Sequence, residues 1–349
     1  MVIGTQHLRG DDWPQFQALA QLGVRHVSAD PLGDWRGWTA QTLSDFKARL
    51  AELGISLDMV LLPLSSAAAP LNGAPHVFLG PPAERDRELD QICELIRNLA
   101  LAGIPAARYN VAFLGHFRTP DRLGRGGARL SSFEYDRLSD PRSGPGQIDP
   151  TRTQRDQAAW SQITAAGPLS ADDIWERIDT FLGRVVPVAE EYRVRLACHP
   201  EDPGIGDNTY LGLPRVLGTV AGLKRFVEMH PSPYHGLNFC IGTVAEMLAH
   251  PAQEIAEVVR YFGARGKLFN IHFRNIRGGL FNFEETFPDE GDVDMRAVLR
   301  VLHEVGYGYM IMPDHVPQID GAAPAHVAFA YCFGYIRALM QSLDIHETE

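Results

Sequence analysis

The chain has 349 residues, and its 43 acidic against 32 basic side chains give a formal net charge of −11 with histidine neutral. This balance disfavours nucleic acids and anionic membranes as partners, because both attract clustered lysine and arginine. With 45% hydrophobic and 21% charged residues, the composition is typical of a folded globular protein and excludes disorder for most of the chain.

The sequence predicts neither a membrane span nor a signal peptide, and its cysteines do not suggest a disulfide framework. No run approaches the roughly 20 apolar residues that cross a bilayer, and the start of the sequence lacks a basic segment followed by an apolar one. We therefore expect a soluble, cytoplasmic protein. The four widely spaced cysteines do not suggest a disulfide framework: Cys93, Cys198, Cys240 and Cys332. We expect at least some of them to be free thiols, packed in the core or bound to a ligand.

Short strand-like runs alternate with longer stretches of helical periodicity. The predicted strands are residues 2–6, 24–28, 56–62, 106–110, 194–199, 237–240, 268–273 and 309–313. The predicted helices are residues 12–22, 40–53, 84–102, 172–191, 215–229, 251–264, 293–304 and 324–342. Several helices end at a glycine suited to a left-handed cap, as at Gly23 and Gly306.

Eight strand-helix pairs in series predict an α/β protein with a closed (β/α)8, or TIM, barrel, in which closure removes the exposed sheet edges. The whole chain, residues 1–349, then forms one domain. An open doubly wound sheet is the competing architecture, but no Gly-x-Gly-x-x-Gly turn follows the first strand.

Residues 113–170 interrupt this alternation with a long insertion after strand 4. The segment is rich in Gly, Pro, Arg, Ser and Asp and lacks apolar periodicity. Its position places it on the C-terminal rim of the barrel, where active sites of this fold lie. We interpret it as a lid-like loop region, with a partly disordered surface loop as the alternative.

Four residues that commonly bind metals close strands five to eight: His199, Cys240, His272 and Asp314. Their separations of 41, 32 and 42 residues each equal about one strand-helix unit. Consecutive strand ends are neighbours in a barrel, so the four side chains can converge above its mouth. Any one of them alone would more often be packed or hydrogen-bonded, but the joint pattern predicts a divalent-metal site.

The ligand types restrict the metal without selecting it. Cysteine favours Zn²⁺ or Fe²⁺ over Mg²⁺, whereas histidine and aspartate suit Mn²⁺, Fe²⁺, Co²⁺ and Zn²⁺ alike. A substrate with adjacent oxygens could chelate an ion that keeps open coordination positions, and the ion would then act as a Lewis acid.

Motifs around these four residues resemble those of the mannonate dehydratase family. The resemblance is clearest over residues 95–130 and 195–316. It rests on His199-Pro200-Glu201-Asp202-Pro203, Phe239-Cys240-Ile241-Gly242-Thr243, Ile271-His272-Phe273-Arg274-Asn275-Ile276 and Pro313-Asp314-His315. Upstream it includes Asn98-Leu99-Ala100, Gly103-Ile104, Tyr109-Asn110, Arg118-Thr119 and Gly124-Arg125-Gly126-Gly127.

The resemblance implies a metal-dependent lyase on a TIM barrel that removes water from D-mannonate to give 2-keto-3-deoxygluconate. It further implies Mn²⁺ or Fe²⁺ as the metal, held by the four residues named above, and a homo-oligomer. More distantly, the barrel is similar to the xylose-isomerase-like superfamily of sugar isomerases and epimerases.

Two segments depart from the family pattern. A tyrosine taken to act in catalysis is expected after the Asp-His pair, but the sequence there is Ala325-His326-Val327-Ala328-Phe329-Ala330-Tyr331, with His326 in the tyrosine's place. The aromatic and acidic residues expected before the Arg-Thr pair are replaced by Leu114-Gly115-His116-Phe117. The predicted metal site is kept while part of the substrate pocket has changed.

Elimination of water next to a carboxylate requires charge stabilisation and proton transfer. Arg274, two residues past His272, is the predicted partner of the substrate carboxylate, and a salt bridge to Glu201 or Asp202 is the alternative. His315 is the predicted general acid or base, followed by His326.

The predicted substrate-binding residues are Tyr109 and Asn110 at the end of strand four, Arg118 and Arg125 from the insertion, and Glu285. Glu285 belongs to an acidic segment, residues 284–292, that we otherwise interpret as a solvated turn and helix N-terminus. Residues 329–335 form an aromatic stripe at helical spacing, facing the core or another subunit.

Dehydration of a small-molecule sugar acid is the leading hypothesis. One alternative keeps the barrel and metal but performs isomerisation, epimerisation or elimination from a keto-glycoside, and it is motivated by the two altered segments. A third hypothesis is a sugar-acid-binding protein that has lost turnover, motivated by the missing tyrosine.

Overall fold

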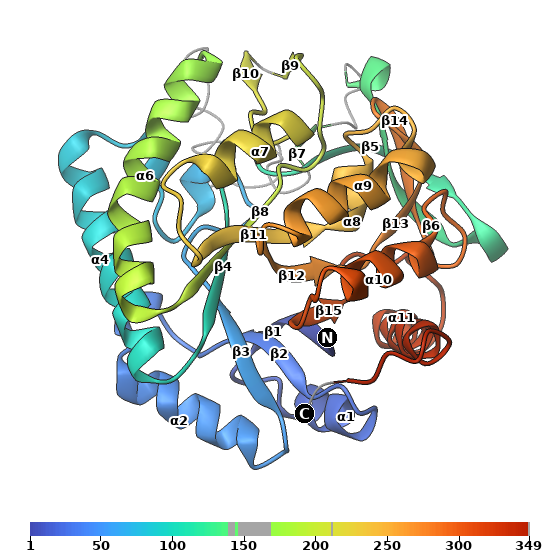
Figure 1. Ribbon diagram of the computed structural model, residues 1–349, viewed down its shortest axis with the longest axis horizontal. Helices are drawn as coiled ribbons and strands as arrows, with labels where there is room; N and C mark the ends of the chain where they lie inside the picture. The colour runs from blue at the N-terminus through green and yellow to red at the C-terminus, as the bar shows by residue number, and fades with distance from the viewer. Residues whose placement is uncertain (139–143, 146–168, 211, 348–349) are drawn as a thin grey trace.

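A closed ring of parallel strands forms the centre of the protein in the computed structural model, which describes residues 1–138, 144–145, 169–210 and 212–347. Eight strands close the ring in the order β1-β15-β12-β11-β8-β4-β3-β2, and helices surround it (Figure 1). The barrel strands are β1 Val2–Arg9, β2 His26–Asp30, β3 Ser56–Leu61, β4 Ala106–Asn110, β8 Arg195–His199, β11 His235–Cys240, β12 Leu268–His272 and β15 Met310–Met312. The predicted (β/α)8 barrel is thus confirmed, with a strand at each of the eight predicted places.

The helices cover the outer face of the barrel and bury one apolar side against it. The main helices are α1 Trp13–Gln21, α2 Ala40–Ala51, α4 Pro82–Leu101, α6 Ala171–Tyr192, α7 Val220–Glu228, α9 Pro251–Gly263, α10 Met295–Glu304 and α11 Pro324–Gln341. Short helices are η1 Trp35–Gly37, η2 Ala69–Leu71, α3 His76–Leu79, η3 Arg125–Gly127, η4 Tyr135–Arg137 and α8 Ile241–Ala245.

Local hydrogen bonds explain where these helices begin and end. Ser170 and Asp173 form a reciprocal capping box at the start of α6. α7 begins at residue 220 instead of the predicted 215, because the Thr219 side chain caps it by accepting a hydrogen bond from the Gly222 amide. Gly23 and Gly306 have positive φ angles of 73° and 72°, as expected of left-handed helix caps.

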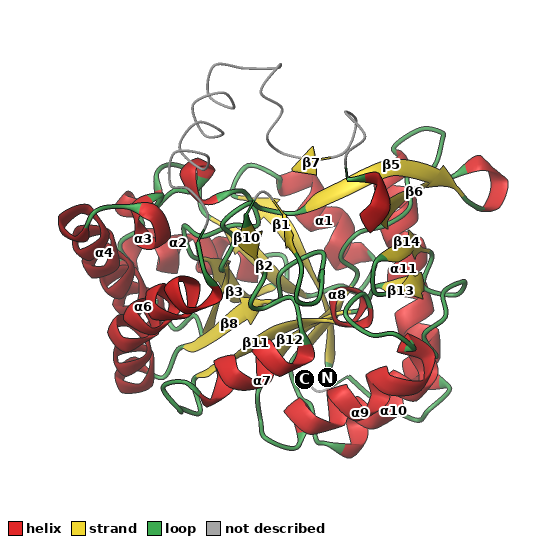
Figure 2. Ribbon diagram, turned by 90° about the horizontal axis from the view of Figure 1, so that it is seen from above, coloured by secondary structure: helices red, strands yellow, loops and turns green. Residues whose placement is uncertain are grey.

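The segment predicted to be a loop insertion contains regular structure in its described part. Strands β5 Phe117–Leu123, β6 Arg129–Glu134 and β7 Gly144–Pro145 join β13 Asn275–Gly279 and β14 Asn282–Thr286 in an antiparallel sheet, ordered β13-β14-β6-β5-β7. This sheet lies beside the barrel on the side of α10 and α11 (Figures 1 and 2). β5 pairs with β6 and β7 inside the insertion, and β6 joins the distant strand β14, so the sheet is completed by a partner that the local sequence does not show. A role as a lid stays a prediction, and much of residues 139–168 lies outside the described residues.

The predicted acidic turn and helix N-terminus are present after residue 287, but the first two glutamates of the segment lie in a strand. Glu284 and Glu285 belong to strand β14, and Glu285 is buried. Later in this segment, Asp292 accepts a hydrogen bond from the Gly278 amide, and Asp294 caps α10. The pairing of β14 with β6 therefore carries an acidic side chain inward that the sequence placed in solvent.

A small hairpin, the two chain ends and the cysteines complete the description of the fold. β9 Thr209–Tyr210 and β10 Leu213–Pro214 form the hairpin. Both ends of the described chain lie together, where the Ile3 amide donates to Glu347 at 3.2 Å (Figure 1). The four cysteines are free and buried, in agreement with the prediction. Among the described helices, none has the length and apolar character needed to span a bilayer.

We predict that His235 makes the protein sensitive to acid. The side chain is fully buried at the start of β11, with its Nε2 2.9 Å from the Phe226 carbonyl, and burial lowers its pKa to about 4. The unfolded chain binds this proton near pH 6.5, whereas the folded chain does not. The free energy of unfolding should therefore fall by about 2.5 kcal/mol from this group between pH 7.5 and 4.5.

The measurement is urea unfolding of the wild type and His235→Gln at both pH values. The variant should show the smaller loss of stability on acidification. His303→Gln, which removes an exposed histidine, is the control and should behave as the wild type does. An unchanged pH dependence in His235→Gln would contradict the prediction.

Candidate active site

The four strand-end residues predicted as metal ligands converge at the C-terminal mouth of the barrel. One potential ligand atom from each of His199, Cys240, His272 and Asp314 lies within 4.8 Å of the others. The register explains the convergence: β11 and β12 pair Cys240 with His272, and β12 and β15 pair His272 with Met312, two residues before Asp314. Cys240, His272 and Asp314 are buried.

Surrounding hydrogen bonds determine which imidazole nitrogens face the centre. His199 donates from Nδ1 to the Pro200 carbonyl at 2.7 Å, which leaves Nε2 unprotonated. Gln6 donates from its amide nitrogen to Asp314 at 3.0 Å, so its amide oxygen faces His272 Nε2 at 3.1 Å. His272 Nε2 then carries the proton, and its Nδ1 lone pair is available to a metal.

The residues present fit a divalent metal. His272 Nδ1 is a buried nitrogen without a hydrogen-bond partner among the described residues, and it lies 3.4 Å from Asp314 Oδ2. An ion between two imidazoles, a sulfur and a carboxylate would satisfy this nitrogen and neutralise the acidic groups.

Electrostatics also favour the ligand forms of these side chains. Burial lowers the pKa of His199 and so favours its neutral form. Burial alone raises the pKa of the Cys240 thiol, but Arg274 and His272 together outweigh burial, and the net pKa lies below the ordinary value. Burial likewise opposes ionisation of Asp314, yet His272, His315 and Arg274 hold its pKa well below the usual range.

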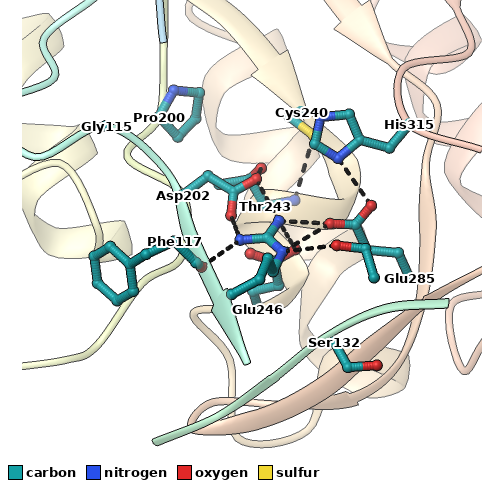
Figure 3. A network of polar contacts seen from close by, with 12 residues as sticks. Gly115, Phe117, Ser132, Pro200, Asp202, Cys240, Thr243, Glu246, Glu285 and His315 are labelled. Atoms are coloured by element: carbon teal, nitrogen blue, oxygen red, sulfur yellow. Dashed lines mark hydrogen bonds and ion pairs between the residues drawn. The ribbon is translucent and has the colours of Figure 1, made fainter. Parts of the chain in front are cut away.

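Arg274 links the four-residue centre to a group of carboxylates. Its side chain is 0% exposed, and its Nη2 donates to Thr243 Oγ1 at 2.7 Å and to Asp202 at 3.1 Å. The same nitrogen lies 3.5 Å from Cys240 Sγ and 3.1 Å from Glu246 Oε1. Figure 3 shows the side chains of Asp202, Glu246 and Glu285 gathered in one polar network. The predicted alternative, a salt bridge to Asp202, is what the structure contains.

Arg118 provides the second cation of this network. It pairs with Asp202 and Glu285, and its side chain is 11% exposed. Asp202 and Glu285 are buried, which opposes ionisation, but the two guanidinium groups and His315 reverse this effect. The pKa of Glu285 falls below its ordinary value, and that of Asp202 falls well below it. Glu246 has a pKa well above its usual range because of burial and the charge of Asp202, so it is the neutral member.

His315 faces the pocket next to this network. Strand β15 ends at Met312, so the alternation of side chains no longer holds and both Asp314 and His315 point inward. His315 Nδ1 lies 2.8 Å from Glu285 Oε2 (Figure 3). Burial alone would lower the pKa of His315, but Asp314 and Glu285 outweigh burial and raise it to about 9.

A pocket of about 280 Å³ opens beside the four-residue centre. Its lining includes three of the four, His199, His272 and Asp314, together with the predicted residues Asn110 and His315. The lining also contains residues that the sequence analysis did not select as site residues: Gln6, Ser65, Ser66, Arg108, His116, Glu201, Asp202, Arg215 and Asn238.

Three predicted site residues lie elsewhere. Tyr109 is fully buried on the outer face of β4, with its ring centroid 5.2 Å from that of Phe181. Arg125 is exposed on the antiparallel sheet, 2.8 Å from Asp289. His326 is exposed near the start of α11 and lines a separate groove between α1 and α11.

Arg108, next to Tyr109 in the chain, lines the pocket where Tyr109 was expected. Side chains alternate along a strand, so Arg108 and Asn110 share the inner face of β4 while Tyr109 faces the helices. This period of two could have identified Arg108 from the sequence. His116 lies within the altered segment 114–117, and its ring centroid is 6.5 Å from that of His315. No motif around Gln6 indicated from the sequence that this residue lies in the pocket.

Comparisons with known proteins show which family this chain resembles over most of its length. Residues 24–349 match the model of the family described as D-mannonate dehydratase (UxuA). The chain is 29% identical over 294 residues to mannonate dehydratase 2 of Halalkalibacterium halodurans, covering 81% of this chain and 80% of that protein. It is 28% identical over 330 residues to a mannonate dehydratase of Thermotoga petrophila, covering 88% and 87%.

Solved structures show the same fold. The crystal structure of mannonate dehydratase from Streptococcus suis serotype 2 aligns with a TM-score of 0.80 at 23% identity, covering 100% of this chain and 97% of that one. The 3-keto-D-glucoside 4-epimerase from E. coli aligns with a TM-score of 0.57 at 15% identity, covering 97% and 99%.

We predict that removing Arg274 destabilises the fold. Arg274→Met leaves Asp202 and Glu285 buried with one cation fewer, so the free energy of unfolding should fall by about 3–5 kcal/mol. Chemical denaturation measures this difference. Arg277→Met is the control, because its ion pair with Glu284 is half exposed and should contribute less than about 1 kcal/mol. Equal stability of Arg274→Met and the wild type would contradict the prediction.

We further predict that metal binding depends on Cys240 and not on Cys198. Cys198 precedes His199 on β8, is equally buried, and belongs to the outer layer near Tyr109. Cys240→Ala should weaken divalent-metal binding by roughly 100-fold or more, because changes outside the ligand set already weaken it 10- to 100-fold. Metal analysis after dialysis and titration with Mn²⁺ measure the effect. Cys198→Ala should retain wild-type metal content, and equal loss in both variants would refute the assignment.

Proposed function

Because the chain belongs to the D-mannonate dehydratase family, we propose that it removes water from a sugar acid, D-mannonate or a close analogue, to give a 2-keto-3-deoxy acid. The observation that carries this proposal is the meeting of His199, Cys240, His272 and Asp314 beside a polar pocket. The pocket volume of about 280 Å³ suits a small polyhydroxylated molecule.

The four residues would hold a divalent ion, with Mn²⁺ or Fe²⁺ favoured by the resemblance and Zn²⁺ or Co²⁺ compatible with the ligands. When bound, the ion supplies Lewis-acid stabilisation of the negative charge that develops on the substrate. Gln6 contacts both His272 and Asp314 and holds these ligands in the orientation that exposes their free electron pairs.

Proton transfer in this proposal belongs to His315. Glu285 holds the ring through Nδ1, so Nε2 remains to exchange a proton with a substrate in the pocket. Loss of hydroxide requires a proton donor, and removal of the acidic C–H proton requires an acceptor. His116 offers a second imidazole on the same pocket. Burial and Arg118 lower its pKa to about 4, so its ring is neutral near pH 7 and can act as a proton acceptor.

The remaining polar residues bind and orient the substrate. Asn110 lines the pocket from the end of β4, level with His199 in the β4–β8 register. Arg118 and Arg274 are engaged by carboxylates of the protein, so their role is to position Asp202 and Glu285 and to favour the Cys240 thiolate. We do not assign the substrate carboxylate to either arginine.

A second candidate is isomerisation or epimerisation at the same site. It is favoured by the altered segment 114–117, because Gly115 and His116 line the pocket and so change its wall. An enzyme of this kind would introduce solvent deuterium into the sugar without net loss of water. The assembly state is also a proposal, a homo-oligomer, which light scattering tests.

The decisive experiment incubates Mn²⁺- or Fe²⁺-loaded protein with D-mannonate and assays the 2-keto-3-deoxy product. We expect turnover that a chelator abolishes and the metal restores. His315→Gln should lower kcat by about 10²- to 10⁴-fold, as expected for loss of a general acid or base. His303→Gln should retain wild-type kcat.

Absence of product across a panel of hexonates and both metals would refute dehydration. Deuterium exchange without water loss would then support the second candidate. Binding of sugar acids without any reaction would identify a non-catalytic homologue.

A further inference from the structure

We propose that Arg108 is the residue that recognises the carboxylate of the substrate. This inference rests on the proposed function, since it names the side chain that binds the carboxylate of the sugar acid. Arg108 is a specificity-determining residue in this proposal: it makes the pocket select acids over neutral polyols of the same length.

The other arginines near the pocket are already bound to groups of the protein. Arg118 is paired with Asp202 and Glu285. Arg215 donates to the carbonyls of Gly115 at 3.0 Å and Asp202 at 2.8 Å. These two cations therefore hold parts of the protein together.

Arg274 is likewise excluded as a direct partner of the substrate. Its side chain is 0% exposed and donates to Thr243 and Asp202, and it is absent from the described lining of the pocket.

Arg108 differs from all three. Its Nε donates to Ser28 Oγ at 2.8 Å, and its terminal nitrogens make no hydrogen bond or ion pair with a described residue. The residue is only 6% exposed, yet it lines the pocket. Asp30 and Asp314 compensate part of this buried charge at longer range, but neither forms an ion pair with Arg108. An anionic ligand would supply the close partner that the guanidinium lacks.

The fold presents the free part of this guanidinium to the pocket. Arg108 lies on the inner face of β4, two residues before Asn110, which pairs with His199 in the β4–β8 register. It is therefore about 6.6 Å along the strand from the level of a proposed metal ligand. Ser28 holds Nε from β2, so the two terminal nitrogens remain for the paired oxygens of a carboxylate.

Few cations in the described lining are free to meet an acid. The carboxylates there have partners of their own, because Asp202 pairs with Arg118 and Arg274 and Asp314 would bind the metal. Arg215 is the other arginine in the described lining, and it is bound to backbone carbonyls. Arg108 is thus the guanidinium that can balance the charge of an entering acid.

The test uses two ligands that cannot react: the 3-deoxy analogue of D-mannonate, which lacks the hydroxyl to be eliminated, and the matching neutral 3-deoxyhexitol. Calorimetry on the Mn²⁺-loaded protein gives Kd for each. Arg108→Met should weaken binding of the acid by about 10- to 100-fold and leave that of the alcohol within about twofold. Arg108→Lys should fall between, because lysine keeps the charge and loses the paired geometry.

Two controls separate recognition from a structural effect. Metal content and thermal unfolding of each variant show whether the site is intact. Arg195→Met removes an arginine from the opposite end of the barrel, where it lines a separate cavity near Tyr309, and should leave both Kd values unchanged. Equal loss of acid and alcohol binding in Arg108→Met, or an undiminished preference for the acid, would overturn the proposal.

The wild type supplies a readout that needs no variant to fold. In a crystal structure with the 3-deoxy acid bound, carboxylate oxygens within hydrogen-bonding distance of the Arg108 terminal nitrogens support the proposal, and a carboxylate bound elsewhere refutes it. Neither measurement depends on turnover. If D-mannonate is not dehydrated but the 3-deoxy acid binds through Arg108, the proposed reaction fails and the acid-recognising role stands.

Discussion

The buried guanidinium of Arg274 is the interaction on which the site depends. It lies between the proposed metal centre and three carboxylates, and it contacts Cys240, Asp202 and Glu246 through one nitrogen. Several acidic groups share this small volume, and their charges can remain ionised there only beside buried cations. The same positive charge favours the thiolate of Cys240, the form that binds a metal. One side chain thus serves both the stability of the rim and the chemistry proposed for the centre.

The arrangement separates two uses of arginine that look alike in the sequence. Arg118 and Arg274 are enclosed by the protein's own carboxylates, which makes them positioning residues. Arg108 is held at one nitrogen and open at the others, which makes it available to a ligand. Burial does not distinguish the two classes, since all three side chains are largely shielded from bulk water. The distinction lies in how many hydrogen bonds each guanidinium already makes.

Three residues predicted for the site lie away from it for different physical reasons: Tyr109, Arg125 and His326. Tyr109 and Asn110 were both placed in the pocket, but neighbours on a strand point to opposite faces, and Arg108 is the residue that shares a face with Asn110. Arg125 and His326 were chosen by their position in motifs or loops, and the structure places both in solvent-exposed regions outside the pocket. Glu285 differs in the opposite direction: the sequence suggested an exposed turn, but the residue is buried in strand β14, which pairs with β6.

The sequence by itself determined the barrel and the four strand-end residues, because apolar periodicity and one residue per strand-helix unit are local features that closure of the ring brings together. Only the tertiary structure decided the charge network and the pocket lining. Gln6 meets His272 from 266 residues away, and Arg118 meets Glu285 from 167 residues away. Such pairs leave no periodic trace in the chain, since their geometry follows from how the strands and loops pack. Which arginine remains free for a ligand is therefore a property of the folded protein.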